Sequence, residues 1–295
     1  MSATDTQPEL EFEEVLRPAG FGARVKELLR TSWLFRIGLV IVVIAVILAI
    51  IGPYIARFPL ETATLDTNEG PSSKHWFGTD SNGFDIFSRV LAAPRIDVSI
   101  ALAATAISLA IGSLLGLLTG YFRGWAGESV MRVVDTIQAF PLFVLAIIVV
   151  VMTGRSIQNV IIVIALLNIP IFLRMMRSQV LSLRERTFVE AARSSGSREL
   201  NIAFGHVLPN GLSPGLAQAP ITMGFAILVT AGLSFIGAGV QPPTPEWGAM
   251  IASGADTIVI GEWWTSVFPG IAISLTVFGF AVVGEGLRAM YLRQG

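Results

Sequence analysis

The sequence predicts an all-α polytopic membrane protein with six transmembrane helices, and three observations support this prediction. First, 53% of the 295 residues are hydrophobic and only 14% are charged, whereas soluble domains carry about 25% charged residues. A chain so poor in charge cannot cover its surface with ionic groups, so much of that surface faces lipid. Second, six apolar runs are long enough to cross a bilayer. Third, lysine and arginine gather on alternate sides of these runs, as in proteins inserted with a fixed orientation.

The six runs define the expected domain organisation. A transmembrane helix needs about 20 mostly apolar residues, and the runs that meet this length are 35–56, 98–121, 130–153, 157–176, 212–240 and 264–287. Asp135, Pro141 and Pro170 interrupt the third and fourth runs, and membrane helices tolerate proline where neighbouring helices satisfy the freed carbonyl groups. The predicted units are a cytoplasmic polar tail (1–34), a first helix with an external segment (35–97), a five-helix core (98–288) and a cytoplasmic C-terminal end (289–295).

The distribution of positive charge predicts that both termini lie in the cytoplasm. Fifteen of the twenty lysines and arginines fall in the N-terminal tail, after the second and fourth runs, and at the C-terminus. Cytoplasmic loops carry such an excess, so residues 177–211 are expected inside and residues 57–97 and 240–263 outside. The segment 57–97 is rich in Pro, Asn, Gly and Asp, which predicts an ordered, turn-rich structure. The tryptophans of the 240–264 loop are expected to anchor at the membrane interface.

The composition excludes several chemistries. The chain has no cysteine, so disulfides, thiolate catalysis and cysteine-ligated metals are absent. The two histidines, His75 and His206, are far apart and lack metal-ligand spacing, so no metal site is expected. A net charge of −1 excludes a strongly basic nucleic-acid-binding surface. An intramembrane enzyme would need a nucleophile with a base, or a metal constellation, and the chain shows neither.

The segment 177–211 carries the most informative local pattern. On a helix, Arg186, Glu190 and Arg193 follow one another at i, i+4 and i+7 as a stripe of alternating charge. On the opposite side of the same helix lie one aromatic and two small side chains, Phe188, Ala191 and Ala192. Gly196 is placed to turn the chain at the helix end. The pattern predicts a short amphipathic helix, a turn and a second short helix beneath the membrane; a solvated loop helix is the alternative.

These residues resemble a known motif. The order Glu190-Ala191-Ala192-x3-Gly196, followed by Leu208-Pro209, is similar to the EAA loop in membrane subunits of binding-protein-dependent ABC importers. His206 stands where the general pattern has isoleucine, and HVLPN resembles the variant of the peptide/nickel permease subfamily. Further stretches similar to that subfamily are HWFGTDSNGFDIFSRV at 75–90, GYFRGW at 120–125, AFP at 139–141, LSFIGAGVQPPTPEWG at 233–248 and FPG at 268–270. The ending VGEGLRAMYLRQG departs from the usual GDGLRDALDP-like pattern.

The resemblance implies a type I ABC importer permease fold in a bacterial plasma membrane. It implies an ATP-driven importer of peptides or related solutes, in which this subunit, surrounded by membrane lipid, pairs with a homologous second permease. The other implied partners are two cytoplasmic ATPase subunits and an external solute-binding protein. The residues implied in contact with the ATPases are Arg186, Glu190, Ala191, Ala192, Gly196, His206, Leu208 and Pro209. The chain itself has no GxxxxGK[ST] phosphate loop, so ATP and Mg²⁺ are expected only on the ATPases, and no cofactor is expected here.

An ion-coupled secondary transporter is the alternative function. It would need ionisable residues or broken helices at the membrane midplane, and the second, fourth and fifth runs have no charged residue in their interiors. Asp135 and Glu285 lie near cytoplasmic helix ends, and each has an arginine three residues away, Arg132 and Arg288. These four residues are therefore expected to form paired boundary charges.

Four residues keep two interpretations each. Gln218 and Thr222 share one face of the fifth helix at i and i+4, where they either line a translocation path or form hydrogen bonds between helices. His75 and Trp76 serve either docking or local structure. The transported solute also stays open, because the subfamily covers dipeptides, oligopeptides, glutathione, nickel complexes and some sugars.

Overall fold

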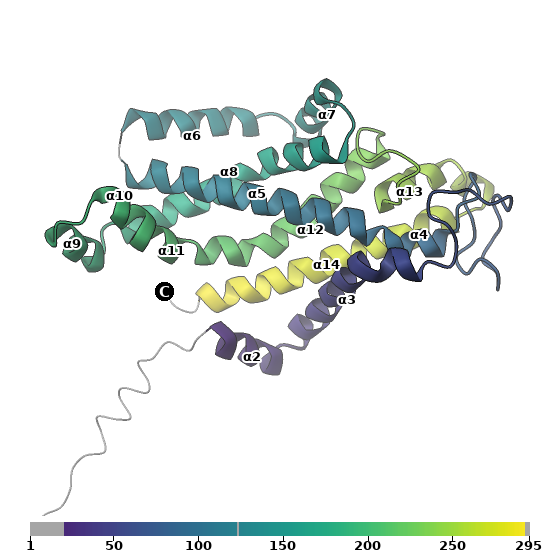
Figure 1. Ribbon diagram of the computed structural model, residues 1–295, viewed down its shortest axis with the longest axis horizontal. Helices are drawn as coiled ribbons and strands as arrows, with labels where there is room; N and C mark the ends of the chain where they lie inside the picture. Colours follow the sequence, from purple (N-terminus) through teal and green to yellow (C-terminus); the bar gives the residue numbers. More distant parts are fainter. Residues whose placement is uncertain (1–20, 123, 293–295) are drawn as a thin grey trace, which may run out of the picture.

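Long apolar helices run along the molecule and set its shape (Figure 1). The computed structural model describes residues 21–122 and 124–292. Five helices are long and apolar enough to cross a membrane: α3 (Trp33–Ile55), α5 (Pro94–Tyr121), α8 (Ile157–Leu183), α12 (Ser213–Phe235) and α14 (Trp264–Leu292). The described residues contain no β-strand, only one isolated bridge between Thr79 and Asp85. The expected all-α membrane fold is confirmed.

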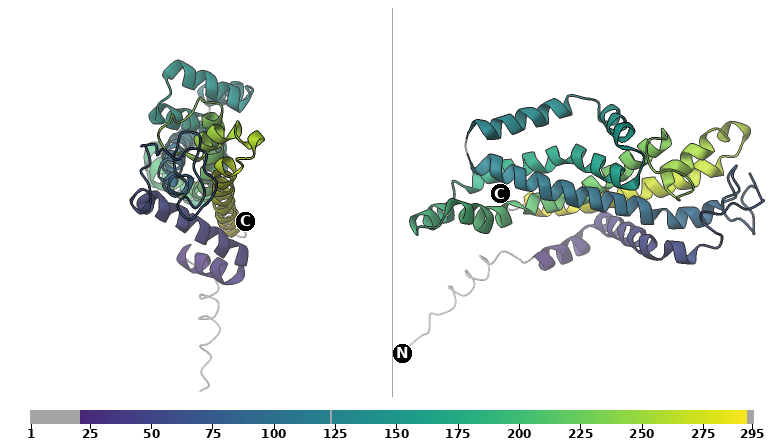
Figure 2. Two further views of the ribbon diagram at one scale, coloured as in Figure 1. Left: turned by 90° about the vertical axis from the view of Figure 1, so that its right-hand side faces the viewer. Right: turned by 45° about the horizontal axis from the view of Figure 1, so that its top comes forward.

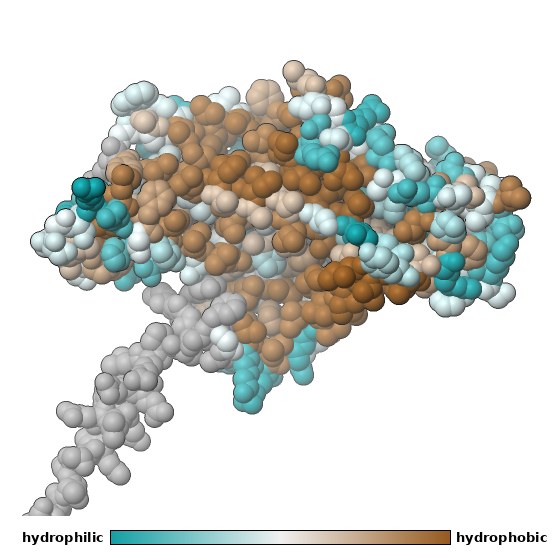
Figure 3. Space-filling view, viewed as in Figure 1, coloured by the Kyte–Doolittle hydropathy of each residue, from teal (hydrophilic) through white to brown (hydrophobic). Residues whose placement is uncertain are grey.

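The surface of the bundle is apolar in the middle and polar at both ends. Figure 3 shows a broad hydrophobic band flanked by hydrophilic residues at each end of the long axis. Helix α3 exposes large apolar side chains on this band, among them Val40 at 57% and Ile50 at 64% of their surface. Apolar surface of this extent is stable only against lipid or another apolar protein surface.

Helices α5 and α8 pack at backbone distance because glycines line their contact. A Cβ atom at Gly112 would lie 2.8 Å from the carbonyl oxygen of Ile169, and one at Gly116 would lie 2.6 Å from that of Leu173. Both distances are shorter than real Cβ contacts. Small residues let membrane helices approach this closely without a steric penalty. The two helices are therefore in direct backbone contact.

The third predicted span, 130–153, is wrong as a single helix. It consists of α6 (Trp125–Gln138) and α7 (Leu142–Thr153), which meet at 94°. Pro141 stands at the break, where it lacks a donor N–H and keeps the preceding residue out of the helical region. Helix α6 runs alongside the α5–α8 pair (Figures 1 and 2), with an apolar groove of about 520 Å³ between them. Residues 21–122 and 124–292 contain six spans only if this broken pair counts as one.

This arrangement corrects one predicted charge pair. Asp135 forms an ion pair with Arg174 of α8 at 2.6 Å, because α6 folds back alongside α8 and brings the two residues together. The expected partner Arg132 is not the residue it contacts. The second predicted pair is confirmed, since Arg288 lies 3.5 Å from Glu285.

Other helix boundaries differ from the predicted runs. A short helix, α4 (Ile86–Ala92), leads into α5, so helical structure begins well before residue 98. Helix α8 continues seven residues past 176, and α12 stops at Phe235. Helix α2 (Phe21–Thr31) occupies part of the predicted polar tail. Residues 1–20 of that tail and 293–295 of the C-terminal end lie outside the described residues.

The two polar ends of the bundle are built from different segments (Figure 2). We call residues 56–85 and 236–263 the polar cap. It contains α13 (Trp247–Ala255) and the short 3-10 helix η2 (Ile258–Ile260). The opposite end carries the segment 177–211, which we call the EAA loop. Beyond the end of α8, this loop forms α9 (Thr187–Ser194), α10 (Glu199–Ile202), the π-helical turn η1 (Ala203–Val207) and α11 (Leu208–Gly211).

Candidate functional site: the EAA loop and the polar cap

The EAA loop is a helix, a glycine turn and a second helical segment, as the pattern predicts. Gly196 has a φ of +83°, which an L side chain adopts only with strain. Its N–H donates to the carbonyl of Arg193 at 3.0 Å, and the N–H of Ser197 donates to that of Ala192 at 3.2 Å. These two bonds form a Schellman motif that closes α9. The predicted turn at Gly196 is confirmed.

The second helical segment continues to the start of α12 and contains a local widening. Residues 203–207 form a π-helical turn between α10 and α11, a feature that often occurs at functional positions. His206 lies in this turn, and its carbonyl accepts a hydrogen bond from the Asn210 side chain at 2.6 Å. Pro209 stands in the first turn of α11, where a missing N–H is tolerated.

A small apolar cluster holds the EAA loop against the bundle. Val189, Ile202 and Val207 are fully buried and pack in one cluster with side chains from the ends of α5 and α8: Leu117, Tyr121, Met176 and Val180. Half-buried Ala192 and Leu208 pack against the same cluster. The loop is therefore attached to the two central helices and is not a free connector.

The remaining predicted site residues face outward. The exposed members are Arg186, Glu190, Ala191, Gly196, His206 and Pro209. The expected charge stripe is wrong, because Arg193 binds Glu199 across the turn at 2.7 Å and Arg186 precedes the helix as its N-cap residue. The guanidinium of Arg193 holds the pKa of the Glu199 carboxyl down at about 2. Arg193 and Glu199 meet only because Gly196 reverses the chain between them.

Sequence analysis missed two exposed apolar side chains on the loop. Leu200 exposes 58% and Phe204 exposes 41% of its surface, and Phe188 on α9 exposes 39%. The spacing of Leu200 and Phe204, at i and i+4 on one helical segment, was the signal available in the sequence. The loop therefore exposes apolar side chains as well as charged ones of both signs, such as Glu190 and Arg186.

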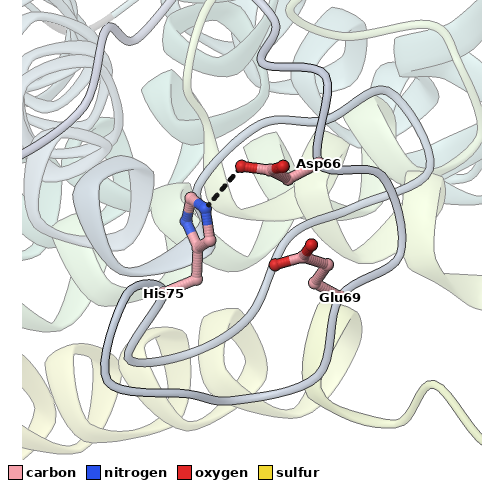
Figure 4. A group of neighbouring side chains, drawn as sticks. All are labelled: Asp66, Glu69 and His75. Carbon is pink, nitrogen blue, oxygen red and sulfur yellow. Dashed lines mark hydrogen bonds and ion pairs between the residues drawn. The ribbon is translucent and has the colours of Figure 1, made fainter.

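The polar cap contains a buried histidine with two carboxylates. His75 is fully buried, its Nδ1 lies 2.8 Å from Asp85 Oδ1, and its Nε2 lies 3.4 Å from Asp66 Oδ2 (Figure 4). Asp85 in turn accepts the N–H of Ser88 at 2.8 Å and caps α4. These contacts favour a structural role for His75 over a docking role. Trp76 exposes 52% of its surface.

Asp66, Glu69 and His75 have the donor set of a metal site. Their ligand atoms lie within 4.8 Å of one another, and Figure 4 shows the two carboxylates and the imidazole facing a common centre. Asp66 also forms an ion pair with the Lys74 ammonium, and this hydrogen bond lowers the pKa of the Asp66 carboxyl. Because Lys74 and His75 both pair with Asp66, ion pairing accounts for the arrangement of these side chains.

The burial of Trp247 in the polar cap contradicts its predicted role as an interface anchor, whereas Trp264, the first residue of α14, is half buried. Trp247 is 2% exposed, and its indole N–H donates to the carbonyl of Val90 at 3.2 Å. The indole N–H of Trp264 donates to the carbonyl of Thr79 at 3.2 Å. Both rings connect segments far apart in the chain. Trp263 exposes 48% of its surface, and its role as an interface anchor stays a prediction.

A buried carboxylate pair joins the polar cap to α5. Glu246 accepts the N–H groups of Gly248 and Ala249 at 2.9 and 2.7 Å and so caps α13. Asp97, fully buried in the first turn of α5, accepts the N–H of Trp247 at 3.3 Å. Sequence analysis did not single out these two residues. The contact attaches α13 to one end of α5.

Gln218 and Thr222 lie in the N-terminal half of α12. Thr222 is 2% exposed, and its hydroxyl donates to the Gln218 carbonyl of the same helix at 3.3 Å. Gln218 itself is half buried. This bond satisfies Thr222 locally, so the contribution of both residues to a translocation path stays a prediction.

The fold and this site define a class of protein. The chain is a multi-pass helical membrane protein that projects an anchored helix–turn–helix loop from one polar end, and its sequence has no phosphate-binding loop. A membrane subunit that works with separate partners fits this description.

Comparison with known proteins gives the family. Residues 112–293 match the model of the binding-protein-dependent transport system inner membrane component, and residues 21–71 match the N-terminal TM domain of oligopeptide transport permease C. The chain is 41% identical to the dipeptide transport system permease protein DppC of Alkalihalophilus pseudofirmus, over 88% of this chain and 86% of the relative. It is 43% identical to the glutathione transport system permease protein GsiD of Escherichia coli, over 90% and 86% respectively.

The chain therefore belongs to the family of binding-protein-dependent transport system inner membrane components. It is a permease subunit of an ABC importer and not itself an enzyme, since ATP hydrolysis in this family takes place in separate subunits. The expected family and the expected type I permease fold are both confirmed.

Proposed function

We propose that this permease takes up short peptides, with the EAA loop as its contact to the ATPases. The relatives named for dipeptide and glutathione transport support this substrate class, since each aligns along most of both chains. The observation that carries the coupling role is the EAA loop itself. It is firmly attached to α5 and α8 by buried Val189, Ile202 and Val207, yet it exposes apolar side chains at the tip of the molecule.

The proposed mechanism is alternating access driven from outside this chain. When partner ATPases bind ATP with Mg²⁺ and close, they move the EAA loops of this subunit and of a homologous second permease. The loops tilt the helix bundles and open the path between them to the other side. In this chain Glu190 provides the anionic contact, Ala191 and the exposed apolar side chains provide the close-contact surface, and Gly196 provides the turn.

The proposed orientation places the EAA loop and both termini in the cytoplasm of a bacterium. The excess of lysine and arginine around the EAA loop and the tail supports this orientation. The polar cap then lies outside the plasma membrane, where a solute-binding protein delivers the peptide. The ordered cap, built on buried polar contacts, offers that protein a firm surface.

Reconstitution tests the proposal. We expect the complete complex of two permeases, ATPases and binding protein to take up peptide, and we expect peptide-loaded binding protein to raise ATP turnover. The lone subunit should neither hydrolyse ATP nor move solute down a proton or sodium gradient. Gradient-driven uptake by the lone subunit would instead establish the ion-coupled alternative. Identifying the ligand that copurifies with the binding protein gives the substrate.

A further inference from the structure

One carboxylate joins three helices at the EAA-loop end of the bundle. Tyr121, the last residue of α5, donates its hydroxyl hydrogen bond to Oε2 of Glu199 at the start of α10. The guanidinium of Arg193 in α9 donates to both oxygens of the same carboxylate, at 2.7 and 3.2 Å. The two-pronged contact with Arg193 orients the carboxylate, as paired guanidinium bonds do. We call Tyr121, Arg193 and Glu199 the latch.

The surroundings of the latch connect it to α8 as well. Arg184, which follows α8, donates to the carbonyl of Gly120 at 3.0 Å and lies 3.2 Å from the carboxylate of Glu185. These side chains and the latch line one open recess of about 420 Å³. The ring of Tyr121 is 8% exposed and packs in the apolar cluster beneath the loop. The hydroxyl is thus held in place from the α5 side.

Helix α5 is attached at both ends. Its 28 residues give a length of about 42 Å at 1.5 Å per residue. At the far end Asp97 accepts the N–H of Trp247, and along the middle Gly112 and Gly116 contact the backbone of α8. The latch attaches the near end to the EAA loop. Helix α5 thus links the EAA loop to the polar cap through one continuous hydrogen-bonded element.

We propose that the latch transmits motion of the EAA loop to α5 and through it to the polar cap. This inference rests on the proposed function of the loop. Tyr121, Arg193 and Glu199 act here as positioning residues, since none of them touches substrate. Arg193 and Glu199 are half exposed, and such surface ion pairs contribute little to stability. Loss of the latch should therefore weaken coupling without unfolding the subunit.

The first test removes only the hydroxyl of Tyr121. In the complete reconstituted complex, Tyr121→Phe should leave membrane insertion normal and basal ATP hydrolysis within about twofold. Stimulation by peptide-loaded binding protein should fall at least about fivefold, the lower end of coupling between linked sites. The matched control is Tyr54→Phe, because Tyr54 on α3 is 77% exposed and lies far from the loop in the chain. Wild-type stimulation in Tyr121→Phe would overturn the proposal.

The second test exchanges the charges. Arg193→Glu and Glu199→Arg each bring like charges together and should each reduce stimulation. The double variant restores the ion pair with reversed orientation, and Tyr121 can still donate to the carboxylate at position 193. We expect the double variant to recover stimulation by more than half. If the double variant loses as much stimulation as the two single variants combined, a direct role of the ion pair is contradicted.

The last test has a readout independent of activity. Since the chain has no cysteine, spin labels can be placed at Ser197→Cys in the loop and Leu114→Cys on α5 without further changes. In the complex, the label distance should stay narrow and unchanged between nucleotide-free and ATP-bound states, and it should broaden in Tyr121→Phe. Equal distributions in both proteins would overturn the latch. If the wild-type complex shows neither uptake nor stimulation, the proposed function fails instead, so the two failures are distinguishable.

Discussion

The two polar ends of this permease are stabilised in opposite ways. The polar cap is held by hydrogen bonds of buried polar groups, with His75 and Glu246 fully buried and Trp247 nearly so. The EAA loop is held by a few buried aliphatic side chains and the latch, and it leaves Leu200 and Phe204 exposed. The comparison teaches that hydrogen bonds between buried polar groups hold the cap and aliphatic packing holds the loop, while both ends also expose large apolar side chains, such as Val259 on the cap and Leu200 on the loop.

The largest effect should come from breaking the cap. His75→Ala removes one of the hydrogen-bond partners of Asp85, whose carboxyl group is 2% exposed and keeps the N–H of Ser88. A buried polar group left without its partner costs about 1–3 kcal/mol, so thermal unfolding of the detergent-solubilised subunit should shift to lower temperature. His206→Ala is the matched control, because His206 is exposed. Equal stability of both variants would show that the cap does not depend on its buried polar contacts.

Substitutions in the EAA loop should reduce transport and leave the stability of the subunit nearly unchanged. Glu190→Lys reverses an exposed charge, and Gly196→Asp forces a side chain into a left-handed turn at a cost of about 1–2 kcal/mol. We expect both variants to insert normally and to lose peptide uptake by at least about tenfold, within the range of couplings between sites. Ser195→Ala serves as a neighbouring control. Normal uptake at normal expression would identify the loop as a solvated connector.

Thiol labelling tests which side of the membrane the polar cap and the EAA loop occupy. Cysteines introduced at exposed Ser73 and at Val259, which is 89% exposed, should react with a membrane-impermeant thiol reagent in spheroplasts. A cysteine at Ser195 in the loop should react only after the membrane is opened. The native chain gives no background, since it has no cysteine. The reverse labelling pattern would invert the proposed topology.

The smallest effect concerns pH and the latch. The ordinary carboxyl pKa of 4.5 falls to about 2 at Glu199 because Arg193 and Tyr121 bind its charged form. A group with a lowered folded pKa adds its stabilisation above the unfolded pKa and loses it as the pH falls through the folded value. The Ser197–Leu114 label distance should thus be constant from pH 8 to 5 and broaden only between about pH 4.5 and 2. Glu199→Gln should show no such step.

Local sequence patterns predict contacts between residues close in the chain but not contacts between distant ones. The Schellman turn at Gly196 and the ion pair Glu285–Arg288 involve neighbours in the chain, and both follow from spacing alone. In contrast, Asp135 pairs with Arg174, 39 residues away, and Trp247 binds the carbonyl of Val90, 157 residues away. No local period distinguishes these partners from others of the same chemistry.

The sequence by itself determined the class of this protein, the approximate spans and the form of the EAA loop. Hydropathy and positive charge act residue by residue, and a glycine at a helix end acts within one turn. Only the tertiary structure decided that 130–153 breaks at 94° and that Trp247 turns inward while Trp263 stays exposed. An apolar run with an internal proline fits a kinked helix and a broken pair equally well. The choice between them depends on packing against α8, a segment that lies later in the chain.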